Sequence, residues 1–101
     1  MLNVNIEFSK GVLFVRLSGK ITEEKSKNIE DNVLNILEKS GIKYLVFNIN
    51  ELDIEENISL FDKCNLQIEK SKGKMLIIGK EVMNFETASD ELKAMKVMFA
   101  C

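Results

Sequence analysis

Two apolar runs, each preceded by an amphipathic segment that ends in glycine, constrain the fold of this chain most strongly. The first segment ends in EKSG and leads into IKYLVFNI, and the second ends in EKSKG and leads into KMLIIG. A lysine in the last turn followed by glycine is typical of a helix C-terminus, and a nearly continuous apolar run is typical of a strand covered on both faces. The pattern therefore predicts two helices that each return the chain to a parallel strand by a right-handed crossover.

The residues before the first crossover predict an antiparallel hairpin. Apolar residues alternate with polar ones from Leu2 to Phe8, which predicts a strand with one buried face. Residues 9–11 supply a turn, and residues 12–18 form the second strand. Thr22 is the expected N-cap of the first helix, because two glutamates follow it and favour the helix N-terminus; the pattern gives that helix about 16 residues.

Two further helices follow from the spacing of apolar residues. The second helix is expected to carry Ile54, Ile58, Phe61, Cys64 or Asn65, and Ile68 on its apolar side. The last helix is expected to have Thr87 or Ser89 as its cap and the apolar stripe Ala88, Leu92, Met95 and Phe99. The complete order is ββαβαβα, in a single domain over residues 1–101.

Composition argues against several classes of function. The 14 basic and 16 acidic residues of the 101 give a net charge of −2 without a long run of either sign, so nucleic acid is not an expected partner. The chain has no histidine, which removes the commonest general base and zinc ligand, and we expect no metal, cofactor or catalytic residue. Cys64 and Cys101 have no metal-site or disulfide spacing. No secretory signal or membrane-spanning run is visible, so the sequence predicts a cytoplasmic protein without membrane insertion.

Three local patterns carry a resemblance to a known family. They are LSGKIT after the second strand, YLVFNINEL at the third and KGKMLIIG at the fourth. In this order they resemble a STAS domain of the anti-sigma factor antagonist family over roughly residues 2 to 80. The resemblance implies an α/β fold, with a mixed sheet of four or more strands covered mainly on one side by helices. Little chain follows Gly79, so we expect an abbreviated C-terminus whose final helix packs on the sheet.

The resemblance also implies a function in bacterial regulation of transcription. In that family the loop after the third strand and the start of the next helix bind a kinase-type anti-sigma factor. The matching segment here predicts a partner-binding surface on Asn50, Asp53, Glu55, Glu56, Asn57 and Ser59. The chain is then expected to be a non-enzymatic interaction module. The alternative is a STAS-like accessory subunit of a transporter ATPase or of a signalling scaffold; the sequence indicates no oligomeric state.

The family's phosphorylatable serine has no counterpart at the expected place. No serine or threonine occupies residues 53–58, and the first hydroxyl belongs to Ser59, which no glycine follows. Ser59 is a candidate displaced phosphorylation site, although an ordinary helix-surface serine is the favoured interpretation. The sequence therefore predicts a domain that lacks the usual phosphorylation switch.

Three interpretations of the carboxylates Asp53, Glu55 and Glu56 stay open. Asp53 and Glu56 fit a capping box at the start of a helix, with Glu55 in its first turn. A carboxylate could instead stand permanently where the family carries a phosphate, although with less charge. A catalytic or metal-binding pair is the least favoured, because no nucleophile or histidine accompanies it.

Overall fold

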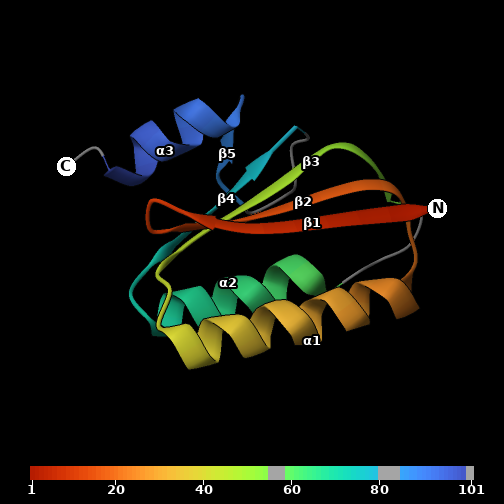
Figure 1. Cartoon of the computed structure of the whole chain (residues 1–101), viewed down its shortest axis with the longest axis horizontal. Helices are drawn as coiled ribbons and strands as arrows, with labels where there is room; N and C mark the ends of the chain where they lie inside the picture. Colours follow the sequence, from red (N-terminus) through yellow and green to blue (C-terminus); the bar gives the residue numbers. More distant parts are fainter. Residues whose placement is uncertain (55–58, 80–84, 100–101) are drawn as a thin grey trace.

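The chain begins with the predicted hairpin and continues through two parallel crossovers into a five-stranded sheet of order β1-β2-β3-β4-β5 (Figure 1). The computed structural model describes residues 1–54, 59–79 and 85–99. The strands are β1 (Leu2–Ser9), β2 (Val12–Ile21), β3 (Tyr44–Ile54), β4 (Lys74–Ile78) and β5 (Thr87–Ala88). The helices are α1 (Glu23–Ser40), α2 (Leu60–Lys70) and α3 (Glu91–Phe99). Only β1 runs antiparallel to its neighbour, so the sheet is mixed.

The ends of α1 match the sequence prediction. The Lys25 amide donates a hydrogen bond to Thr22 Oγ1 at 3.3 Å, so Thr22 caps the helix N-terminus. At the other end Gly41 takes the left-handed conformation with φ 67°, as a C-terminal glycine commonly does. The helix has 18 residues, slightly more than the pattern suggested.

Strand β3 extends further than predicted, and α2 begins later. Residues 51–54 continue the strand by pairing with residues 18–21 of β2. Asp53 and Ile54 therefore lie on a strand, and α2 starts at Leu60, with Ser59 at its N-cap position. The capping-box interpretation is wrong for Asp53, because pairing with β2 keeps that residue extended. Ile54 is not on the helix for the same reason, and Ile58 lies outside the described residues. Phe61, Cys64 and Ile68 are buried on α2 as predicted.

Helices cover the two faces of the sheet unequally (Figure 1). Helices α1 and α2 lie on one face, here called the helix-pair face, over a large apolar core that includes Leu45, Phe47 and Ile77. Of the helices in the described residues, α3 is the one that lies on the opposite face, here called the α3 face. A smaller core lies beneath it, made by Val12, Phe14, Val46, Leu76, Ile78, Ala94 and Met98. The sheet is thus covered mainly on one side, as the sequence predicted.

The C-terminal segment differs from the prediction in detail. Thr87 and Ala88 form the short strand β5 beside β4. The cap of α3 is Asp90, whose Oδ1 accepts a hydrogen bond from the Lys93 amide at 2.8 Å. The predicted stripe is correct only in part: Ala88 and Met95 pack against the smaller core, but Leu92 and Phe99 are exposed. Ala94 and Met98, which the prediction left out, are the buried residues of the helix. None of the helices in the described ranges has both the length and the apolar content needed for a bilayer crossing.

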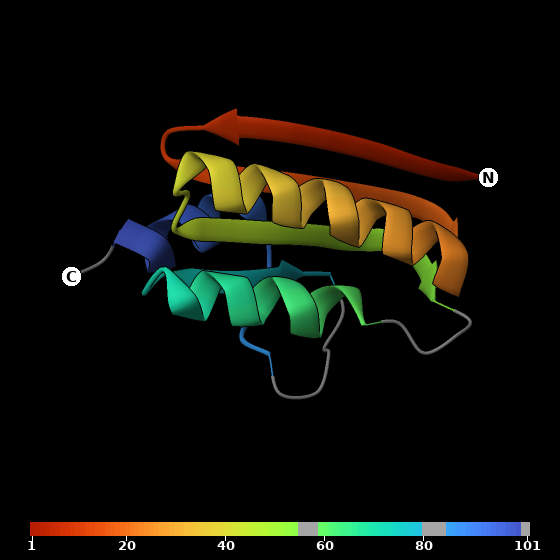
Figure 2. The same ribbon diagram turned by 90° about the horizontal axis from the view of Figure 1, so that it is seen from below.

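The predicted buried face of β1 is only partly correct. Leu2 packs against the core of the helix-pair face, but Val4, Ile6 and Phe8 are exposed on the same side of the strand. Figure 2 shows why: β1 forms the edge of the sheet and lies outside the area that α1 covers. Alternation correctly predicted a strand, but it could not show that the covering helix stops short of it.

Candidate functional site

The carboxyl ends of the parallel strands carry part of the predicted partner-binding surface. Asn50 and Asp53 are exposed on β3, near the end of that strand. Loops and residues at the carboxyl ends of parallel strands form the usual binding sites of such sheets. Glu55, Glu56 and Asn57 lie outside the described residues, so the interpretations that depend on them stay predictions.

Alternation along β3 separates Asp53 from Ser59. Leu52 and Ile54 pack into the core of the helix-pair face, so Asp53 between them points to the α3 face. Ser59 instead contacts α1, which lies on the helix-pair face. Asp53 and Ser59, which the sequence placed on one surface, thus lie toward opposite faces of the sheet.

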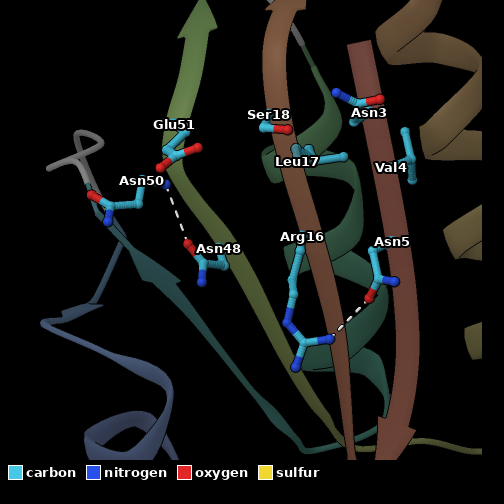
Figure 3. A pocket seen from close by; sticks show the side chains of 9 residues that line it. All are labelled: Asn3, Val4, Asn5, Arg16, Leu17, Ser18, Asn48, Asn50 and Glu51. Atoms are coloured by element: carbon cyan, nitrogen blue, oxygen red, sulfur yellow. Dashed lines mark hydrogen bonds between the residues drawn. The ribbon is translucent and has the colours of Figure 1, made fainter.

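A β-bulge in β3 shapes the α3 face near Asn50. The pairing of β2 with β3 passes from Arg16 and Asn48 to Ser18 and Glu51, so β3 has one extra residue at this point. The Asn50 amide donates a hydrogen bond to Asn48 Oδ1 at 3.2 Å (Figure 3). The Asn48 side chain therefore satisfies a backbone amide of the bulge with a hydrogen bond.

Gly79, which directly follows the neighbouring strand β4, lies close to the Asn50 backbone. This residue follows β4 with φ 107°, and a Cβ there would lie 2.4 Å from the Asn50 Cα. Only glycine allows the two backbones to approach so closely. The chain leaving β4 therefore passes directly against the Asn50 backbone.

Beside this bulge lies a groove of about 290 Å³ that three strands line, mostly with polar residues (Figure 3). Its residues are Asn3, Val4, Asn5, Arg16, Leu17, Ser18, Asn48, Asn50 and Glu51. The sequence analysis did not identify this groove, because its residues come from three separate segments. The polar residues Asn3, Asn5 and Glu7 at every second position of β1 were the available signal, since alternate residues of a strand share one face of the sheet.

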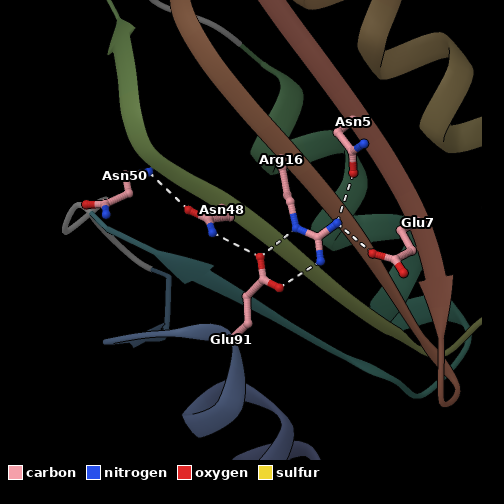
Figure 4. Close-up of polar contacts among 6 residues, drawn as sticks. All are labelled: Asn5, Glu7, Arg16, Asn48, Asn50 and Glu91. Atoms are coloured by element: carbon pink, nitrogen blue, oxygen red, sulfur yellow. Dashed lines mark hydrogen bonds and ion pairs between the residues drawn. The ribbon is translucent and has the colours of Figure 1, made fainter.

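Arg16 is the centre of a polar network at one end of the groove (Figure 4). Its Nε and Nη2 donate to the two carboxylate oxygens of Glu91 at 2.8 Å each. Its Nη1 donates to Asn5 Oδ1 at 2.9 Å and to Glu7 Oε1 at 2.7 Å. Asn48 Nδ2 adds a bond to Glu91 Oε2 at 3.0 Å. The network thus joins α3 to β1, β2 and β3.

These contacts set the charge of the network. Hydrogen bonds from Arg16 hold the pKa of the Glu91 carboxyl below its ordinary value, against the opposing effect of burial. Hydrogen bonds to Glu91, and then to Glu7, raise the pKa of Arg16. One guanidinium therefore faces two carboxylates, and Arg16 is occupied by groups of this chain rather than available for a phosphate.

Ser59 is linked to the interior of the helix pair. Its hydroxyl donates a hydrogen bond to Glu30 Oε1 on α1 at 2.8 Å, and Glu30 is only 9% exposed. The side chain makes no capping bond to the backbone of α2. Ser59 is therefore half-buried and hydrogen-bonded to α1, whereas the sequence analysis favoured an ordinary serine on the helix surface.

Cys64 lies on α2 and is fully buried. Burial, with a smaller effect from the Glu30 charge, raises the pKa of the Cys64 thiol to about 12. Cys101 lies outside the described residues. Within residues 1–54, 59–79 and 85–99, no group of three or more Cys, Asp or Glu side chains is arranged to hold a metal ion.

Comparison with known proteins places this fold. The family model described as STAS domain matches residues 3–80. Among solved structures, the anti-sigma factor antagonist SpoIIAA in its unphosphorylated form aligns over 98% of this chain and 100% of its own, with a TM-score of 0.81 and 11% identity.

Two further solved structures share this fold. A serine-to-glutamate variant of RsbS from Moorella thermoacetica has a TM-score of 0.79 and 13% identity, with 94% of this chain and 93% of its own covered. An anti-sigma factor antagonist from Mycobacterium paratuberculosis has a TM-score of 0.72 and 14% identity, with 97% and 94% covered. At these identities the shared feature is the fold, which is the α/β fold of SpoIIAA.

Proposed function

The chain belongs to the STAS domain family, and on that premise we propose that it is a non-enzymatic interaction module that acts as an anti-sigma factor antagonist. Its partner would be a kinase-type anti-sigma factor or a related regulator. The proposed contact surface is the end of β3 and the segment that leads into α2, from Asn50 to Phe61.

The arrangement of β3 supports this surface. Asn50 and Asp53 are exposed on β3, where Asp53 pairs with Lys20 of β2 and Asn50 lies in the bulge between paired residues, so neither is on a free loop. The bulge and the close approach of Gly79 hold the Asn50 backbone in one position. Fixed polar positions lose little conformational entropy when a partner binds. The exposed Asn50 and Asp53 on β3, with Gly79 close against the Asn50 backbone, are the observation on which the proposal chiefly depends.

We further propose that Ser59 does not act as a phosphorylation switch. A phosphate on Ser59 would bring almost two negative charges beside the buried Glu30 carboxylate, where the hydroxyl now donates a hydrogen bond. Burying like charges together is unfavourable. The folded domain would therefore resist this modification rather than use it.

Affinity capture from the native host tests the proposal. The tagged protein is compared with Asp53→Lys, with the double variant Glu55→Gln and Glu56→Gln, and with the control Asp31→Lys. Asp31 is exposed on α1 and undergoes the same charge reversal as Asp53. A kinase-type regulator identified by mass spectrometry, and recovered less with Asp53→Lys but normally with Asp31→Lys, is the expected result.

Three other outcomes of these experiments would contradict parts of the proposed function. Subunits of a transporter ATPase in the captured fraction would favour the accessory-subunit alternative. Equal recovery of a regulator with both charge reversals would place the contact away from β3. Incubation with the captured kinase and ATP should leave the intact mass unchanged, and a gain of one phosphate on Ser59 would refute the absence of a switch.

A further inference from the structure

The outer edge of β1 is open. In the part of the chain that the structure describes, β2 is the only strand that pairs with β1, and β1 is eight residues long. A strand at the edge of a sheet presents a row of backbone N–H and C=O groups to any chain that can pair with it. The other edge strand, β5, has only two residues.

The turn of the hairpin decides which residues of β1 present these groups. Ser9 pairs with Val12 across a turn of two residues, Lys10 and Gly11, which have φ 54° and 83°. A two-residue turn makes the closing pair a hydrogen-bonded one, and such pairs alternate along an antiparallel ladder. Asn3, Asn5 and Glu7 therefore bond to β2. The backbone groups of the even-numbered residues point outward.

The same even-numbered residues carry exposed apolar side chains. Val4 is 45% exposed, Ile6 is 38% exposed and Phe8 is 58% exposed. Their partners in β2 belong to the core of the helix-pair face, so all three project on that face. Strand β1 itself lies outside the area that α1 covers (Figure 2). An apolar stripe and a row of available hydrogen-bonding groups thus belong to the same three residues.

The edge lacks the features that usually prevent edge-to-edge pairing. The chain contains no proline, and β1 contains no lysine or arginine. The register between β1 and β2 runs from Leu2 to Ser9 without a bulge. The one charge in β1 belongs to Glu7, which is paired with Arg16 on the other face. Natural edge strands normally carry at least one such protection.

We propose that β1 pairs antiparallel with β1 of a second copy of this chain, across a two-fold axis at Ile6. In this register Ile6 faces its own counterpart and Val4 faces Phe8 of the other copy, so the exposed stripe is covered by itself. Glu7 faces Asn5, so no like charges meet. A surface that is complementary to itself is what a two-fold dimer requires, and aromatic pairs with β-branched residues stabilise neighbouring strands.

Sedimentation velocity over a range of protein concentrations tests the association. The wild-type chain should approach twice its monomer mass as the concentration rises. Ile6→Lys should raise the dissociation constant by at least about tenfold, because two ammonium groups would then face each other at the axis. Leu66→Lys is the matched control: Leu66 is 55% exposed on α2, away from β1, and should leave the dissociation constant unchanged.

Amide hydrogen exchange gives a second test that needs no variant. The amides of Val4, Ile6 and Phe8 should exchange more slowly as the concentration rises, while those of Asn5 and Glu7 should not change. If Ile6→Lys fails to fold, Phe8→Thr replaces it, because threonine retains β propensity while removing the aromatic contact. A monomer at all concentrations up to about 1 mM, or equal weakening by Leu66→Lys, would overturn the proposal.

Discussion

The two faces of the sheet hold their helices by different means. On the helix-pair face, α1 and α2 lie on a continuous apolar core, and the bond between Ser59 and Glu30 is a polar link between these two helices. On the α3 face, a helix of nine residues buries only Ala94 and Met98, and the Arg16 network joins it to the strands. Apolar burial thus stabilises the first face, whereas the second depends in part on charge pairing, which ionic conditions can change.

The largest expected difference between the faces is in the unfolding free energy that is lost when a buried apolar side chain is replaced by alanine. Phe47 is fully buried on the helix-pair face, and its ring packs edge to face on Phe61 with centroids 5.1 Å apart. Phe47→Ala should lower the free energy of unfolding by about 3–5 kcal/mol, whereas Met98→Ala on the α3 face should cost about 2 kcal/mol. Urea unfolding measures both. Equal losses would show that the α3 face contributes as much as the helix-pair face.

A smaller effect is expected from the Arg16 network. A double-mutant cycle with Arg16→Met and Glu91→Gln should give a coupling of about 1–2 kcal/mol, because the pair is bidentate and partly buried. The control cycle uses Lys74 and Glu86, whose charged atoms lie 3.2 Å apart on more exposed side chains. That surface pair should give about 0–0.5 kcal/mol. A coupling at Arg16 no larger than this would leave α3 held by apolar contacts alone.

The hydrogen bond between Ser59 and Glu30 should contribute less to stability than the Arg16 network does. Ser59→Ala removes the hydrogen bond to the buried Glu30 and should cost about 1 kcal/mol, measured by the same urea unfolding. Ser89→Ala is the control, because Ser89 is exposed and precedes α3. Unchanged stability in Ser59→Ala would mean that water satisfies Glu30 without the serine.

The distance in sequence between contacting residues explains which parts of the structure could be predicted. The hairpin, the Thr22 cap and the two crossovers depend on residues close together in the sequence, and all were predicted. The end of β3 was not, because residues 51–54 are kept extended by pairing with β2, a contact distant in sequence. A capping pattern at Asp53 is locally plausible, yet strand pairing overrides it.

The candidate site was predictable only in part for the same reason. Asn50 and Asp53 were singled out through a resemblance that covers the end of the third strand, and their role in binding stays a prediction. The groove and the Arg16 network were missed, since Arg16 and Glu91 are 75 positions apart and no local pattern connects them. The apolar stripe of the helix that carries Glu91 was predicted only in part, so the position of its carboxylate could not be foreseen.

Acid titration gives the smallest expected effect and isolates the charge on the α3 face. Hydrogen bonds from Arg16, and to a lesser extent from Asn48, lower the pKa of Glu91 in the folded protein below its ordinary value of 4.5. The ionised form therefore contributes stability that is fully present above pH 4.5 and is lost as the pH falls through the folded pKa. Glu91→Gln lacks this contribution, so the difference in unfolding free energy between wild type and variant should shrink below pH 4.5. Urea unfolding of both proteins across this range measures that difference, in which the other carboxyl groups largely cancel. A difference that stays constant down to about pH 3 would show that the guanidinium does not favour ionised Glu91, and that neutral hydrogen bonds suffice to hold α3 on the sheet.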